Sequence, residues 1–169
     1  MSPEVSSAAC NVRLYAMEGT SANGQLFDHL VRCETRIFNA LTDGLKAEHG
    51  VGAAQFEFLQ YLARHPRSRV ADLAVNFAIG IGATSKGIDR LEARGWARRV
   101  PNPEDRRSSL VELTPAGREL AEAMEKTFRE QLDALIGSVV GEDRVATVTA
   151  VLAELRGALE ERGVGLPAG

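Results

Sequence analysis

The chain has 169 residues, enough for one domain with helical additions, and its 44% hydrophobic content is ordinary for a globular protein. Aromatic residues make up only 5%, so stacking platforms for RNA or single strands are poorly supplied. Cys10 and Cys33 show no CxxC spacing, which leaves no basis for a disulfide framework or a zinc site, and we expect no metal or cofactor. Without a long apolar run or a secretion signal, we expect a cytoplasmic protein with no membrane partner.

The net charge of −3 is unevenly distributed along the sequence. Residues 64–118 contain eleven Lys/Arg against six Asp/Glu, a net charge of +5. Residues 1–63 carry −3 and residues 119–169 carry −5. Positive charge gathered on one continuous segment indicates a polyanionic partner for that segment.

The first part of the chain is expected to be an arm followed by a long helix. Residues 1–23 are rich in Ser, Ala and Asn and predict a flexible N-terminal arm, with a short helix at Asn11–Glu18 as the alternative. From Gly24 to about His49, apolar residues recur every three or four positions, which is the stripe of an amphipathic helix. These residues are Leu26, Leu30, Cys33, Ile37, Leu41 and Leu45.

The middle of the chain predicts three shorter helices and a hairpin. Helices are expected over 53–65, where Phe56, Leu59 and Leu62 point inward, over 70–77, and over 81–93 after the turn at residues 78–80. Strands are expected at 96–100 and 109–113, with a proline-bearing loop between them. Thr114 followed by Pro115 predicts a capped helix start.

The last part of the chain predicts two helices. The first continues from Pro115 through Leu135 and breaks near 137–141, and the second runs over 142–161 before a frayed tail. The expected fold is mainly α with a small β-hairpin wing, a winged helix-turn-helix flanked by N- and C-terminal helices. Its segments are an arm at 1–23, an N-terminal helix at 24–52, a DNA-binding region at 53–114, C-terminal helices at 115–162 and a tail at 163–169.

The helix over 81–93 carries residues suited to contacts with double-stranded DNA. Thr84 and Ser85 are small hydroxyls that can reach phosphates or base edges, and Lys86 and Arg90 can donate to guanine or phosphate. Gly87 would permit close approach. A solvated, non-functional helix face is the alternative for these residues taken alone.

The hairpin loop strengthens the DNA interpretation. Its run Glu104-Asp105-Arg106-Arg107 places like charges side by side, and this self-repulsion is costly unless an outside partner neutralises it. Arginine is favourably placed in a narrow, electronegative minor groove. Asp105 is expected to accept hydrogen bonds from a nearby arginine or the loop backbone and so hold the tip in shape. The alternative is an exposed turn with an unimportant salt bridge.

Three blocks of sequence, in this order and spacing, resemble the MarR-type transcriptional regulators. They are Asp89-Arg90-Leu91-Glu92-Ala93-Arg94-Gly95-Trp96-Ala97-Arg98-Arg99, Pro103-Glu104-Asp105-Arg106-Arg107, and Leu113-Thr114-Pro115-Ala116-Gly117-Arg118. With the flanking helices, the resemblance covers roughly residues 25–160.

The resemblance implies a homodimer whose first, fifth and sixth helices interlock and which presents two winged helices to a pseudo-palindromic operator. It places Thr84, Ser85 and Lys86 at the family's recognition-helix contacts, and Asp105 and Arg107 at its Asp-x-Arg wing motif, with Arg107 in the minor groove. It further implies a regulator, most commonly a repressor, that is released by a small aromatic or anionic effector.

The sequence departs from the family pattern at two glycines. Gly80 replaces a frequent Ser or Thr at the start of the recognition helix, and Gly82 replaces a frequent proline, so a late or mobile helix start is expected. The run from Gly80 to Gly87 also resembles a phosphate-cradling loop. It lacks the GxxxxGK[ST] order and a preceding strand, which disfavours nucleotide binding.

An effector site is expected on the first helix. His29, Arg32 and Arg36 share one side of that helix and could receive a carboxylate or phenolate, with surface salt bridges to Glu34, Asp43 or the partner subunit as the commoner alternative. Cys33 is expected to be a small core residue, and a redox-responsive regulator using Cys33 is an alternative. In the peroxide-sensing branch of the family the reactive cysteine follows a Gln-Leu pair, whereas in this chain Gln25-Leu26 is followed by Phe27.

Two other classes of protein were weighed. His29, His49 and His65 lie on different predicted helices with no nucleophile motif or metalloprotease motif, so an enzyme is not expected. A helical dimeric interaction protein that does not touch DNA is the second alternative, and the basic segment with its arginine tip argues against it. Trp96 is expected to pack the wing onto the domain.

Overall fold

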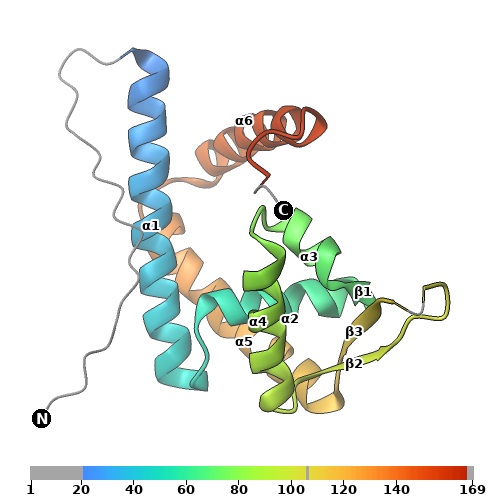
Figure 1. The fold of residues 1–169 in the computed structure, drawn as a ribbon. Coiled ribbons are helices and arrows are strands. Elements are labelled where there is room, and N and C mark those ends of the chain that lie inside the picture. The colour runs from blue at the N-terminus through green and yellow to red at the C-terminus, as the bar shows by residue number, and fades with distance from the viewer. Residues whose placement is uncertain (1–20, 106, 167–169) are drawn as a thin grey trace, which may run out of the picture. The chain divides into compact units, whose positions relative to one another are not determined.

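The computed structural model describes residues 21–105 and 107–166. Residues 1–20 of the predicted arm, with Cys10 and the alternative of a short helix at Asn11–Glu18, therefore lie outside the described residues, as does Arg106. The long helix begins at Ala22, two residues before its predicted start at Gly24. Within the described ranges, the six helices and the hairpin follow one another in the order expected from the sequence, with one further short strand, β1 (Figure 1). They are α1 (Ala22–His49), α2 (Ala53–Arg64), β1 (Ser68–Arg69), α3 (Val70–Asn76), α4 (Ile81–Ala93), β2 (Ala97–Pro101), β3 (Ser109–Leu113), α5 (Pro115–Leu132), a π-helical turn (Asp133–Gly137) and α6 (Glu142–Glu161).

The chain divides after Arg36 into two compact units. In the first unit, the described residues form the beginning of α1, where Leu26, Phe27 and Leu30 are exposed. The second unit contains the end of α1 and all the other elements. Most of the hydrophobic core lies in this second unit and positions the winged helix.

The core of the second unit gathers the apolar faces of its helices around α2. Phe56, Leu59 and Leu62 of α2 are buried as expected, because their spacing places them on one face of the helix. Leu41 and Leu45 of α1 and Met124 of α5 are buried in the same cluster. Phe56 and Phe128 add a tilted ring contact at 5.0 Å between centroids.

The three strands form one small antiparallel sheet in the order β1-β3-β2. The hairpin β2–β3 was expected, and its register runs from Ala97 opposite Leu113 to Pro101 opposite Ser109. Strand β1 was not expected, because two residues are too few for a period-two pattern. It pairs Ser68 with Val111 and so attaches the start of α3 to the hairpin.

The turn between α3 and α4 takes its shape at Ala78 rather than at a glycine. Ala78 has a φ of +50°, and the N–H of Ile79 donates to Ala74 while the N–H of Ala78 donates to Val75. This pair of bonds is a Schellman motif, in which glycine usually occupies the left-handed position. Gly80, in contrast, is extended, with a φ of −62°.

The fourth helix begins at Ile81, directly after Gly80, so the expectation of a late start was wrong. Gly80 has no side chain with which to cap the helix, but the Thr84 N–H donates to the Gly80 carbonyl at 3.0 Å and closes the first turn. Gly87 allows close approach, as expected, but toward α2: a Cβ there would lie 2.3 Å from the ring of Phe58. This glycine therefore serves packing of α4 within the domain.

The junction between the wing and α5 is fixed by a short polar network. Thr114 accepts a hydrogen bond from the Gly117 N–H at 3.1 Å and donates its hydroxyl to the Gly95 carbonyl at 2.7 Å. The helix start expected from Thr114 and Pro115 is thus confirmed. Trp96 is half-buried against the core, and Arg94 lies over its ring.

The C-terminal helices follow the expected pattern. The π-helical turn continues α5 to Gly137, and α6 begins at Glu142 after the predicted break. No residue of α6 is buried, although it carries a stripe of exposed apolar side chains. Among residues 21–105 and 107–166, no helix is long and apolar enough to cross a membrane.

Candidate nucleic-acid interface

The candidate contacts on α4 differ sharply in exposure. Thr84 is fully buried, and its hydroxyl donates to the Gly80 carbonyl at 3.1 Å. It lies at the fourth position of the helix, on the same face as Ile88 and Leu91, both of which are also fully buried. A side chain held in this way is unable to reach a base, so Thr84 leaves the set of candidate contacts.

Lys86 and Arg90 lie on the solvent side of α4, one turn apart. Both side chains are exposed, and neither forms an ion pair with any residue that the structure describes. Their charges are therefore available to an outside anion.

Arg99 of β2 ties the sheet to α4. Its guanidinium pairs with Asp89 at 2.8 Å and with Glu92, and it lies 3.4 Å from the hydroxyl of Ser85. The carboxylate of Glu92 also accepts the backbone N–H of Arg99 at 2.8 Å. Ser85 is consequently half-buried against Arg99, and its hydroxyl is less free than the sequence suggested.

The wing tip has the arrangement expected of Asp105. Its carboxylate accepts the backbone N–H of Arg107 at 2.9 Å, which is the loop-backbone bond predicted from the sequence. Arg107 is exposed, and its guanidinium has no ion pair among the residues described. The placement of Arg106 lies outside those residues.

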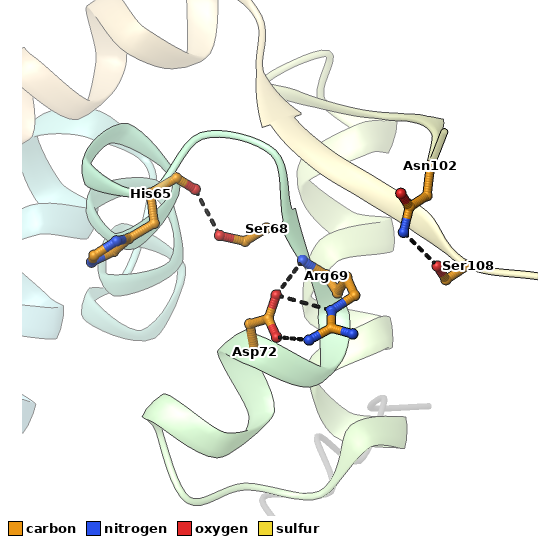
Figure 2. A network of polar contacts seen from close by, with 6 residues as sticks. All are labelled: His65, Ser68, Arg69, Asp72, Asn102 and Ser108. Carbon is orange, nitrogen blue, oxygen red and sulfur yellow. Dashed lines mark hydrogen bonds and ion pairs between the residues drawn. The ribbon is translucent and has the colours of Figure 1, made fainter. Parts of the chain in front are cut away.

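Asn102 is a wing residue that the sequence analysis missed. Only 9% of it is exposed, and its side-chain amide donates to the Ser108 hydroxyl at 2.9 Å across the hairpin (Figure 2). Its Oδ1 accepts the backbone N–H of Glu104 at 3.0 Å. An Asn followed by Pro103 in the sequence is a turn signal, but the partner across the loop depends on the register of the strands.

A second polar cluster joins β1 to α3 beside the wing. Asp72 accepts the Arg69 backbone N–H at 2.8 Å and pairs with the Arg69 guanidinium at 2.9 Å, while Ser68 donates to the His65 carbonyl at 2.7 Å (Figure 2). The hydrogen bond from Arg69 lowers the pKa of Asp72 below its ordinary value. Asp72 raises the pKa of Arg69, and the charges of Asp105 and Glu104 act in the same direction.

A polar hollow of about 420 Å³ lies between β1 and the base of the wing loop. It is lined by Arg69, Asp72, Asn102 and Glu104, among others. Glu104 therefore shares this hollow with the cation on β1, whereas Arg107 does not line it and has no ion pair among the described residues.

Ion pairs within the basic segment show which cations are available. Arg69 pairs with Asp72, Arg98 pairs with Glu112, and Arg99 pairs with both Asp89 and Glu92. The unmatched cations of α4 and the described part of the wing are Lys86, Arg90 and Arg107. Three unpaired cations of this segment are therefore exposed on α4 and the wing, the two elements selected from the sequence.

The other candidate residues lie on α1. Arg32 pairs with Asp28 at 2.7 Å, a partner not foreseen, while His29 and Arg36 are exposed. Cys33 is a free, exposed thiol, so the expectation of a core residue was wrong for the single chain. Among the described residues, no group of three or more His, Cys, Asp or Glu side chains could hold a metal ion.

This arrangement of helices, wing and cations has counterparts among known proteins. The model of the MarR family matches residues 49–108. The multiple antibiotic resistance protein MarR of Escherichia coli is 30% identical over 129 residues, which cover 76% of this chain and 87% of MarR. The chain belongs to the MarR family. The predicted family and fold class are thereby confirmed.

Other members of the MarR family give the same picture. The transcriptional repressor NicR of Pseudomonas putida is 34% identical over 119 residues, covering 70% of this chain and 75% of NicR. A crystal structure of a mutant Escherichia coli MarR bound to operator DNA superposes with a TM-score of 0.71 at 26% identity, covering 78% of this chain and 93% of that one. One of these relatives is named as a transcriptional repressor, and the other was crystallised with operator DNA.

Proposed function

We propose that the protein is a sequence-specific regulator of transcription that binds double-stranded DNA through α4 and the wing. The observation that carries this proposal is the set of exposed, unpaired cations Lys86, Arg90 and Arg107 on α4 and the wing, beside Arg98 and Arg99, which are paired with carboxylates of the same domain. Ser85, Asp105 and Arg106 remain in the proposed interface, with Asp105 holding the loop rather than touching phosphate. Arg107 inserts into a minor groove beside the major groove that receives α4.

The active form is a homodimer. The exposed apolar residues Val148, Val151, Leu155 and Leu159 fall at spacings of three and four, so they form one stripe along α6. Leu26, Phe27 and Leu30 leave a second apolar surface near the start of α1. A second copy of the chain covers these stripes and presents two recognition helices about 34 Å apart, one helical turn of DNA.

The protein acts as a repressor that a small molecule releases from a pseudo-palindromic operator. A groove of about 460 Å³ between α2 and α5 suits a small ligand, and it brings together Arg64, Arg118 and Arg129, none ion-paired among the described residues. An anionic effector there would act where the winged domain meets α5. His29 and Arg36 on α1 remain a second candidate, since Arg32 is already paired.

The test is a binding measurement with two duplexes across a series of salt concentrations. The duplexes are the region upstream of the protein's own gene and a scrambled duplex of equal length. A regulator prefers the upstream duplex, and each neutralised phosphate contributes about −0.9 to the slope of log K against log salt. Equal, salt-insensitive binding to both duplexes, or none in dilute buffer, would contradict the proposal.

If the protein is instead a helical dimeric interaction protein, it should remain a dimer and should either bind both duplexes equally, without dependence on salt, or bind neither in dilute buffer. The redox alternative predicts that peroxide releases DNA in the native chain and not in Cys33→Ser. The exposed thiol of Cys33 is the one observation that favours the redox alternative.

A further inference from the structure

The loop of the wing is long for a hairpin and carries its own repulsive charges. The paired register ends with Pro101 opposite Ser109, which leaves residues 102–108 outside the ladder. Hairpin loops of two to five residues are the common ones. Pro101 lacks an N–H, so it cannot donate a further backbone bond to the opposite strand.

Asn102 supplies the missing connection with its side chain. Its amide bridges to the Ser108 hydroxyl at 2.9 Å, immediately beyond the last backbone pair. Figure 2 shows Asn102 and Ser108 facing each other across the hairpin. At 9% exposure, this amide is shielded from water, which strengthens the bond and makes its loss costly.

The bonds of Asn102 continue to Arg107. Ser108 accepts from Asn102 and donates its own hydroxyl to the Asp105 carbonyl at 3.2 Å, and the Ser108 N–H reaches the same carbonyl at 3.1 Å. Asp105 in turn holds the backbone N–H of Arg107 through its carboxylate. Every donor and acceptor in this series is used consistently with its chemistry.

We infer that Asn102 is a positioning residue for DNA binding, one that fixes the wing tip so that Arg107 enters the minor groove without reordering the loop. The inference rests on the proposed function, because it assigns Asn102 a role through Arg107. A loop already ordered in the free protein avoids an entropic cost on binding. Asn102 itself, being buried, contributes no direct contact with DNA.

The test is a double-mutant cycle measured on the upstream duplex. Arg107→Ala should weaken binding about tenfold to a hundredfold because it removes a charge-assisted contact, and Asn102→Ala should weaken it about tenfold because Arg107 keeps its charge but the loop must be ordered on binding. In the Arg107→Ala background, Asn102→Ala should then change the affinity less than about twofold. In the Lys86→Ala background it should retain its full effect, since Lys86 lies on another element.

A measurement without DNA distinguishes this inference from the proposed function. Backbone amide exchange at Glu104, Arg107 and Ser108 should accelerate in Asn102→Ala, while the amides of α2 keep their protection. Should Asn102→Ala fail to fold, Ser108→Ala replaces it in the binding and exchange measurements, because it breaks the hydrogen bonds that run from Asn102 through Ser108 to Asp105.

Three results would overturn the inference. They are native affinity in Asn102→Ala, an undiminished loss in the Arg107→Ala background, and unchanged exchange in the loop. If the native chain ignores DNA while loop exchange still accelerates, the proposed function has failed and Asn102 orders the wing for some other purpose, which also removes its assigned role.

Discussion

Burial decides which side chains of α4 can take part in recognition. Thr84 and Ser85 have the chemistry to touch DNA, yet the first is enclosed and the second lies against Arg99. Lys86 and Arg90 remain exposed on the same helix. In the proposed interface, the free charges of Lys86 and Arg90 would lie in the major groove, and that of Arg107 would lie in the adjoining minor groove.

Lys86 and Arg107 should therefore differ in how they affect specificity. Arg107→Ala should weaken binding to all duplexes nearly equally, by about tenfold to a hundredfold, and reduce the salt slope by about one. Lys86→Ala should change the preference between the upstream and scrambled duplexes, because a lysine in the major groove can donate to guanine. Fluorescence anisotropy with both duplexes measures the two effects. An unchanged affinity in both variants would remove these residues from the interface.

Gly117 is fixed by the backbone of Trp96. A Cβ at this position would lie 1.9 Å from the Trp96 carbonyl oxygen, which has no flexible end to move. Gly117→Ala should lower the free energy of unfolding by about 1–3 kcal/mol or more, as overpacking does. Gly82→Ala is the matched control, because its Cβ meets nothing within 4 Å and should stabilise α4 by about 0.5–1 kcal/mol. Urea unfolding of both variants gives the comparison.

The ends of α3 and α4 have the same hydrogen-bond pattern but different residues in the left-handed position. Gly95 occupies it after α4, with a φ of +71°, and Ala78 occupies it after α3. The turn that carries the recognition helix is therefore held by a residue under mild strain, at a point where glycine would be relaxed.

Replacing Ala78 with glycine should stabilise the fold. The left-handed conformation costs an L-residue about 1–2 kcal/mol, and the extra freedom of glycine in the unfolded chain offsets part of that gain. We expect Ala78→Gly to raise the free energy of unfolding by about 0.5–1 kcal/mol. Ala83→Gly, inside the right-handed α4, should lower it by about 1 kcal/mol. Destabilisation by both changes would contradict the strain at Ala78.

The pair formed by Arg69 and Asp72 should make α3 sensitive to acid. Arg69 lowers the pKa of Asp72, so the carboxylate stabilises the fold at neutral pH, and this contribution is lost as the pH falls through its folded-state pKa, below about 3.9. Because the pair is partly exposed and the asparagine oxygen can still accept the Arg69 N–H, we expect Asp72→Asn to cost only about 0.5–1 kcal/mol at pH 7. The difference between the two proteins in urea unfolding should shrink toward pH 3. A constant difference at all pH values would contradict this role.

Most elements of the fold could be predicted from the sequence because their signals are local. Apolar spacing and turn residues located the helices and the hairpin to within a few residues. Strand β1, the burial of Thr84 and the bridge from Asn102 to Ser108 depend on how distant segments meet, and periodicity carries no such information. The exposed position of Cys33 was missed for a related reason. Cys33 lies on the apolar stripe of the first helix, and such a stripe does not show whether it packs against the same chain or against another one.

The apolar stripe of α6 links the fold to its assembly. A single chain leaves Val148, Val151, Leu155 and Leu159 exposed, with no residue of α6 buried. Such a surface is stable in water when another surface covers it. The proposed dimer provides that cover and brings two wings to one duplex.

Leu155→Glu should separate the dimer, because it places a charge in the middle of this stripe. Analytical ultracentrifugation should show a monomer or a markedly weakened dimer, and binding to the upstream duplex should fall with it. Ala150→Glu introduces the same charge roughly opposite on α6 and should leave the mass of the native assembly unchanged. A native-like dimer in Leu155→Glu would show that α6 is not the interface.

Because Thr84 is buried and the Ser85 hydroxyl lies against Arg99, neither side chain is free to select an operator by hydrogen bonds to bases. With so few informative groups projecting from α4, hydrogen-bond matching alone discriminates over a short span of base pairs. The remaining selectivity then has to come from how readily a given stretch bends or narrows to meet both wings. Base pairs that no side chain touches should consequently influence affinity, and the flexibility or stiffness of the base-pair steps between the half-sites should contribute to operator specificity.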